Sequence, residues 1–170
     1  MYKLRRSDQW CKRRSSNTFE GSKMTSCERL NSVAPDLVVL AKTLSSVQQK
    51  AMACRAAEWA CRSAGITDSM SGGWLRFLSD PSYQATTNEL QAIADDASYF
   101  DEKYFEIVEQ HDGLDDAGEA MSWFRKARAA SAVSYALGAS SIGGFCEALY
   151  EAHAATDDLL TLRKLCSVEH

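Results

Sequence analysis

Acidic side chains are concentrated in residues 89–119, a segment with eleven carboxylates and a single basic residue, Lys103. Closely spaced carboxylates can hold a metal ion, take part in acid–base catalysis or attract a basic protein. A helix gains no stability from such a concentration, because like charges three or four residues apart repel each other. The segment therefore indicates a function that needs negative charge. Its acids are Glu89, Asp95, Asp96, Asp101, Glu102, Glu106, Glu109, Asp112, Asp115, Asp116 and Glu119.

A partner-binding surface, which we call the acidic face, is predicted along a helix at residues 88–110. At 100° per residue, four of its acids fall within an arc of roughly 60°, opposite the apolar stripe of the helix. Two aromatic side chains border this arc, and aromatic residues rimmed by charge are typical of interface anchors. We therefore expect a basic protein to bind there. The acidic face consists of Asp95, Tyr99, Glu102, Phe105, Glu106, Glu109 and Asp112.

A helix face that is merely solvated is the other interpretation of these acids. The next predicted helix carries Arg125, Lys126 and Arg128. These basic residues could neutralise part of the acidic face inside the protein, which would favour the solvated interpretation.

The remaining carboxylates allow an alternative function, a small helical enzyme or a metal-binding protein. Glu147 and Glu151 share a helix face, and the pair Asp95-Asp96 lies in the middle of a predicted helix. A di-iron bundle, however, needs Glu-x-x-His motifs on two facing helices, and the spacing from Glu151 to His153 is one residue too short. The sequence therefore predicts no catalytic residue, no metal ligand and no cofactor.

Glu58 interrupts the apolar stripe of the first long helix and has two candidate environments. It lies three and four residues from Arg55 and Arg62, a spacing that favours a buried ion pair. The alternative is a functional carboxylate in a pocket lined by Trp59 and Trp74.

Charge divides the chain into two parts. Residues 1–23 hold seven basic and two acidic groups, whereas the rest of the chain is acidic enough to bring the net charge to −4. Residues 1–32 lack helical periodicity and are predicted to be a disordered basic leader, followed by a single helical domain at 33–170. The acidic domain should repel nucleic acid and attract basic proteins or cations.

The six cysteines contain no Cys-x-x-Cys motif, so a zinc ribbon or a thioredoxin-type site is not expected. Cys54 and Cys61 would lie roughly 10 Å apart on one helix, which is too far for a mutual disulfide. We expect reduced cysteines that serve as small core residues, and hence a cytoplasmic location. No stretch of about 18 apolar residues predicts a membrane span.

Helical periodicity runs through the chain from Pro35 onward, and no pattern favours a strand. The clearest helix, at 88–110, has an inward stripe of Ile93, Ala97, Phe100, Tyr104, Ile107 and Val108. The predicted fold is all-α, an up-down bundle of five to six helices with a disordered basic N-terminal tail. Helices are predicted at residues 35–64 with a bend near Ser45-Ser46, at 68–78, 88–110, 115–137 and 141–154, and from Thr156 onward.

Together these observations favour a cytoplasmic binding protein without catalytic activity, whose acidic face masks a basic partner. The concrete form we expect is an immunity protein or inhibitor of a bacterial toxin, such as a nuclease with a basic cleft. Nucleic acid, a membrane and a cofactor are not expected as partners.

Overall fold

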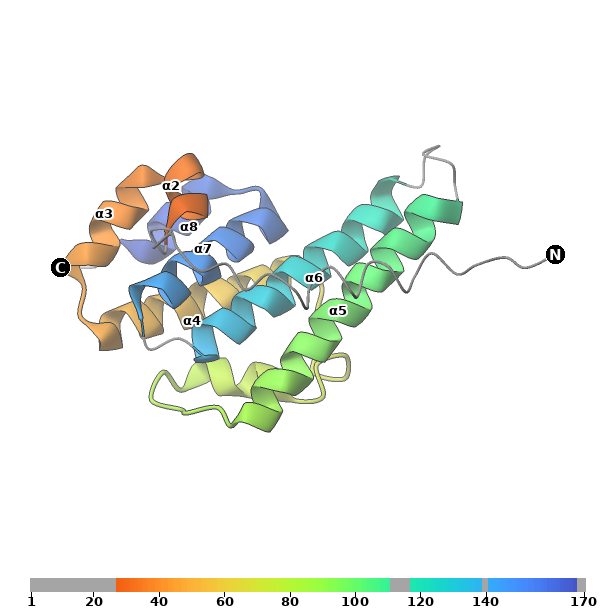
Figure 1. The fold of residues 1–170 in the computed structure, drawn as a ribbon, viewed down its shortest axis with the longest axis horizontal. Coiled ribbons are helices and arrows are strands. Elements are labelled where there is room, and N and C mark those ends of the chain that lie inside the picture. Colours follow the sequence, from red (N-terminus) through yellow and green to blue (C-terminus); the bar gives the residue numbers. More distant parts are fainter. Residues whose placement is uncertain (1–26, 111–116, 139–140, 168–170) are drawn as a thin grey trace, which may run out of the picture.

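The computed structural model describes residues 27–110, 117–138 and 141–167, and the regular elements of this part are all helices (Figure 1). The predicted all-α fold is confirmed. Within the described residues, no helix is long and apolar enough to cross a bilayer. The elements are α2 (Glu28–Val33), α3 (Pro35–Thr43), α4 (Ser46–Ser63), the 3₁₀ helix η1 (Trp74–Ser79), α5 (Thr87–Gln110), α6 (Ala117–Gly138), α7 (Ile142–Thr156) and α8 (Leu159–Cys166).

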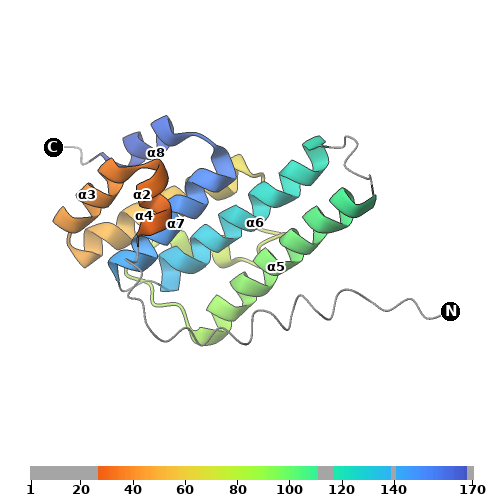
Figure 2. The ribbon, with the colours of Figure 1, turned by 45° about the horizontal axis from the view of Figure 1, so that its top comes forward.

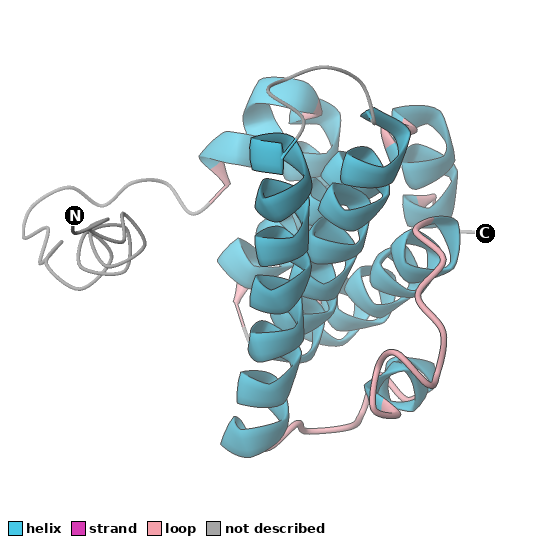
Figure 3. Ribbon diagram, turned by 90° about the vertical axis from the view of Figure 1, so that its right-hand side faces the viewer, coloured by secondary structure: helices cyan, strands magenta, loops and turns pink. Residues whose placement is uncertain are grey.

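Alanine dominates the interfaces between the three central helices, α4, α6 and α7. Figure 3 shows the helices of the described part packed against one another and joined by loops. Small side chains let helix axes approach closely, because little side-chain volume separates the backbones. Phe145 and Leu149 of α7 supply bulk to this core, and both are fully buried. The alanines of these helices that belong to the core cluster are Ala53, Ala56, Ala57 and Ala60 of α4, Ala127, Ala129, Ala130, Ala132 and Ala136 of α6, and Ala148, Ala152 and Ala155 of α7.

A disulfide joins Cys27, next to α2, to Cys146 of α7, with the two Cα atoms 5.3 Å apart. The prediction that all cysteines are reduced is therefore wrong for this pair. The two residues are 119 positions apart, and only the folding of α2 onto α7 brings them together. Cys11 lies outside the described residues.

The other described cysteines, Cys54, Cys61 and Cys166, are free and buried, as predicted. Burial raises the pKa of the Cys61 thiol to about 12 and that of Cys166 to about 11. These thiols are therefore protonated near neutral pH and act as small core residues.

Several predicted boundaries need correction. Helix α2 and the fully buried Leu30 belong to the domain, so the prediction of a disordered leader is wrong for residues 27–32. Residues 1–26 lie outside the described part. The predicted helix at 35–64 is two helices, because Ser45 caps the start of α4 in a capping box with Gln48. The predicted helix at 68–78 is instead the short 3₁₀ helix at Trp74–Ser79.

The last helix also begins later than predicted. Thr156 ends α7, and Asp158 rather than Thr156 caps α8 by accepting a hydrogen bond from the Thr161 amide at 2.9 Å. The predicted caps Asp115 and Asp116 lie outside the described residues.

Two contacts fix where α5 begins and how it sits. Glu89 accepts a hydrogen bond from the Thr86 amide at 2.8 Å, and its own amide donates to the Thr86 hydroxyl oxygen at 3.3 Å, which forms a capping box at the helix start. Glu89 also accepts from the Tyr83 hydroxyl at 2.7 Å. Further along, the indole of Trp74 donates to Asp96 at 2.8 Å. The hydrogen bond from the Thr86 amide, followed by those from Tyr83 and the Thr86 hydroxyl, holds the pKa of Glu89 below its usual value.

We predict that reduction of the Cys27–Cys146 disulfide lowers the free energy of unfolding by about 2–4 kcal/mol, because the unfolded chain regains the freedom of a long loop. Urea unfolding with and without reductant measures the change. The double variant Cys27→Ser, Cys146→Ser should have the same free energy of unfolding with and without reductant. Alkylation of Cys27 and Cys146 in the denatured chain without reductant would contradict the disulfide.

We also predict that Glu89→Gln lowers the urea midpoint near neutral pH, because the ionised carboxylate is the better hydrogen-bond acceptor. A lowered folded-state pKa stabilises the fold above the unfolded value of about 4.5, and this stabilisation is lost as pH falls through the folded pKa. The difference between wild type and variant should therefore close as pH falls below 4.5. A difference independent of pH would show that the charge of Glu89 is not what matters.

Candidate functional site

Helices α5 and α6 lie side by side in opposite directions, and their far end projects beyond the other helices (Figures 1 and 2). Near its base α5 packs tightly, since Ile93, Ala97 and Phe100 are buried. Toward the tip, Tyr104 and Ile107 are half-buried. Val108, predicted to point inward, is 39% exposed, which is a correction. Among the described helices, α6 alone lies beside the tip of α5, so less of the inward stripe is covered there (Figures 1 and 2).

The acidic face lies on the exposed side of this projecting helix. Asp95, Glu102, Glu106 and Glu109 are all exposed. The bordering aromatic side chains are half exposed, 48% for Tyr99 and 47% for Phe105. Asp112, the seventh predicted residue, lies outside the described part of the chain. Six of the seven residues are thus accessible together, and their role in binding stays a prediction.

Local partners engage two of the four acids. Asp95 accepts a hydrogen bond from Gln91 at 2.8 Å, and Glu106 pairs with Lys103 at 2.7 Å. The hydrogen bond with Glu106, together with its negative charge, raises the pKa of the Lys103 ammonium. Among the described residues, no ion pair involves Glu102 or Glu109. The negative charge of these two residues is therefore open to solvent.

Two of the three basic residues of α6, Lys126 and Arg128, are directed elsewhere. Lys126 donates a hydrogen bond to Ser122 at 2.9 Å and lies 4.6 Å from the centre of the Trp123 ring. Arg128 binds Asp101 and Glu151. Neither cation pairs with an acid of the acidic face, so the internal neutralisation that would favour a merely solvated face is not made by these two residues.

A buried carboxylate joins charged residues from several helices. Glu151 of α7 is 2% exposed and binds two guanidinium groups, Arg29 at 2.8 Å and Arg128 at 3.3 Å. Arg128 also pairs with Asp101 of α5, and Arg29 pairs with Glu147 at 2.7 Å. These five residues, which we call the Glu151 network, connect α2, α5, α6 and α7. An isolated carboxylate at this depth would be strongly unfavourable, and the two guanidinium groups supply the hydrogen bonds and opposite charge that it needs.

Arg29 is held in place by more than its ion pairs. Its guanidinium lies 4.0 Å from the centre of the Tyr150 ring. Burial disfavours the charged form, but attraction to Glu151 and Glu147 outweighs it and raises the pKa of Arg29 above its usual value. No pattern in the sequence indicated this role, because Arg29 falls in the segment predicted to be a disordered leader.

The carboxylates considered for an enzyme or metal site also have partners within the protein. Glu58 pairs with Arg62, one of its two predicted partners, but at the surface, since its side chain is 37% exposed, so the predicted burial is wrong. Asp96 accepts from Trp74, and Glu147 and Glu151 belong to the Glu151 network. No cluster of three or more metal-ligating side chains occurs within the described residues.

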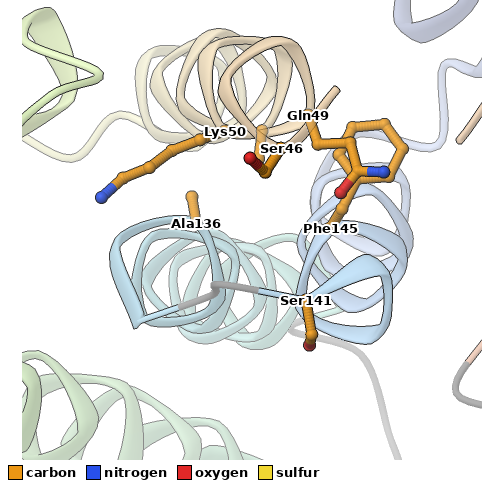
Figure 4. Close-up of a pocket in the computed structure, with 7 residues that line it drawn as sticks. Ser46, Gln49, Lys50, Ala136, Ser141 and Phe145 are labelled. Atoms are coloured by element: carbon orange, nitrogen blue, oxygen red, sulfur yellow. The ribbon is translucent and has the colours of Figure 1, made fainter. Parts of the chain in front are cut away.

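Two hollows lie near the start of α4. The first, of about 10 Å³, has room for a single water molecule. Figure 4 shows Lys50 at its edge, with a side chain that extends away from Phe145 and Ser141 and donates to the Tyr83 carbonyl at 2.7 Å. The second is an open groove of about 710 Å³, bounded by Val47, Pro81 and Leu137.

The charged groups of the groove are already engaged. Lys50 is bound as described, and Asp80 accepts from the amide and hydroxyl of Ser82 at 2.9 and 2.6 Å. Neither hollow therefore has the free, convergent polar groups typical of a small-molecule site.

Comparison of the chain with protein-family models, curated proteins and solved structures found no match. Function must therefore be inferred from the geometry of the chain itself.

We predict that Arg128→Met lowers the free energy of unfolding by about 2–4 kcal/mol, because buried Glu151 loses a guanidinium partner. Adding Glu151→Met should recover part of the loss, since the uncompensated charge is then removed. Urea unfolding of both single variants and the double variant gives the coupling. Arg62→Met, which breaks an exposed pair, is the control and should cost less than about 1 kcal/mol. Additive effects of Arg128→Met and Glu151→Met would contradict the network.

Proposed function

We propose that this chain is a binding protein that uses the acidic face of α5 to mask a basic surface of another protein. The observation that carries the proposal is the combination of two open carboxylates, Glu102 and Glu109, with the half-exposed rings of Tyr99 and Phe105 on a projecting helix.

The closely spaced like charges on this face do not stabilise helix α5. Glu102, Glu106 and Glu109 follow one another at spacings of four and three residues, where each like-charge pair costs a helix roughly 0.2–0.5 kcal/mol. A basic partner would turn this repulsion into attraction and would be steered toward the helix by its field. The two aromatic rings could then supply the desolvated contacts that provide most of the affinity in protein interfaces.

The specific form we propose is an inhibitor or immunity protein for a basic protein such as a toxin nuclease. Nucleases hold phosphates with lysine and arginine, and a row of carboxylates can occupy the same cationic groups. The proposed function is independent of compartment. A cytoplasmic location was predicted from reduced cysteines, and the Cys27–Cys146 disulfide removes that basis.

We predict that neutralising the open carboxylates slows association with the partner without harming the fold. The variant carries Glu102→Gln and Glu109→Gln. The partner is recovered from extracts of the source cell with the wild-type chain as bait, and association rates are measured by surface plasmon resonance at rising salt. The wild-type rate should fall with salt, and the variant should be slower by at least about threefold at low salt and less salt-dependent. Its free energy of unfolding, measured in urea, should stay within about 0.5 kcal/mol of wild type.

The control variant carries Val39→Lys and Leu160→Lys, which change the net charge by the same amount at exposed positions outside α5. It should associate at nearly the wild-type rate. Equal slowing in both variants would mean that only the total charge matters, and the acidic face would then not be the binding site.

A further inference from the structure

Exposed apolar side chains gather around the outer half of the α5–α6 pair. Half of the large hydrophobic side chains that are exposed in the described part of the chain lie there, on a projecting pair of helices (Figure 2). They are Tyr99 at 48%, Phe105 at 47%, Val108 at 39% and Met121 at 40% exposure. Concentrated apolar exposure marks an interaction site more often than scattered single residues do.

The two flanks of the acidic face differ in charge. On one flank the Tyr99 ring meets Trp123 edge to face at 6.3 Å. The ammonium groups of Lys103 and Lys126 lie 5.6 Å and 4.6 Å from the centres of these two rings. Lys103 is paired with Glu106, whereas Lys126 donates to Ser122 and has no acidic partner among the described residues. Lys126 therefore occupies the electron-rich face of Trp123 and would repel a basic partner on this flank.

On the other flank an apolar row crosses from α5 to α6. The Phe105 and Tyr104 rings are 5.0 Å apart, and Tyr104 is 5.7 Å from Phe124 of α6. Val108 lies three residues after Phe105, and Met121 three residues before Phe124, so each shares a helix face with its ring. We call these five residues, Tyr104, Phe105, Val108, Met121 and Phe124, the Phe105 flank.

The charges around the Phe105 flank favour a basic ligand. Glu102 and Glu109 lie within about 60° of Phe105 around the helix, and both are exposed. Arg128 lies 5.5 Å from the centre of the Phe124 ring, but its charge is matched by Asp101 and Glu151. The flank thus has an apolar centre with carboxylates along its α5 edge, while on α6 the exposed Arg125 lies four residues after Met121 on the same helix face. A basic ligand would therefore be held from the α5 side.

We propose that the Phe105 flank is the docking site for a basic amphipathic helix of the partner. This inference rests on the proposed function and specifies how the partner binds. Backbone groups within α5 and α6 are committed to helical hydrogen bonds, so the partner has no sheet edge on which to add a strand. Two adjacent helices instead form a seam that accepts apolar side chains at i, i+3, i+4 and i+7 of a third helix. Lysine or arginine beside that stripe would meet Glu102 and Glu109.

The probe is a synthetic 18-residue peptide with leucine at i, i+3, i+4 and i+7 spacing and lysine and arginine elsewhere. A companion peptide carries glutamate in place of every basic residue. Binding to the full chain is measured by fluorescence anisotropy at low salt. The basic peptide should bind, and the acidic peptide should not.

Variants of the full chain locate the peptide. Phe105→Ser and Val108→Ser should each weaken binding by about tenfold, as expected for interface anchors. Tyr99→Ser on the other flank should weaken binding less than Phe105→Ser does, and the distant control Val39→Ser should stay within about twofold of wild type. All four positions are exposed, so thermal midpoints should change little, and Met121→Ser repeats the test from α6 if an α5 variant is unstable.

Two outcomes separate this inference from the proposed function. If Glu102→Gln with Glu109→Gln abolishes peptide binding but Phe105→Ser and Val108→Ser do not, the acidic face binds and the Phe105 flank does not seat the helix. If Tyr99→Ser weakens binding as much as Phe105→Ser, the asymmetry of the flanks is overturned. If none of these variants changes binding, both proposals fail.

Discussion

The buried carboxylate of Glu151 is the constraint on which the arrangement of the helices depends. A charge that is 2% exposed must be compensated inside the protein, and here two arginines from different helices do so. Arg29 thereby holds α2 against α7. Arg128 reaches from α6 to Asp101 as well, which fixes the rotation of α5 about its own axis. With Asp101 turned toward α6 and α7, the acids at Glu102 and Glu109 are left on the solvent side.

The alanine-rich core explains why such polar contacts carry weight in this fold. Alanine faces permit close packing, yet they are nearly uniform and distinguish poorly between alternative registers of two helices. Three specific contacts form only when the helices are arranged as observed. They are the Glu151 network, the Trp74–Asp96 hydrogen bond and the Cys27–Cys146 disulfide. Small residues therefore allow α4, α6 and α7 to approach, while a few specific contacts decide how the outer helices sit on them.

Local patterns predicted most of the fold, and long-range contacts account for most of the errors. The acidic helix was predicted at 88–110 and observed at Thr87–Gln110, because periodicity and composition are properties of the segment itself. Arg29 and Cys27 could not be assigned, since their partners in α7 lie more than a hundred residues away. Val108 was placed inward by its periodicity, but at the projecting tip α6 alone cannot cover it. The exposure of the acidic face followed from the helix pattern, whereas the difference between its flanks depends on residues of α6.

The central claim is that Glu102 and Glu109 meet a basic protein, and carboxyl footprinting tests it most directly. Exposed carboxylates are labelled with a carbodiimide and an amine, on the chain alone and in complex with its captured partner, and are quantified by mass spectrometry. The account predicts that labelling of Glu102 and Glu109 falls severalfold in the complex while exposed Asp68 and Asp157 are labelled equally in both states. Unchanged labelling of Glu102 and Glu109, with protection on another helix, would contradict it.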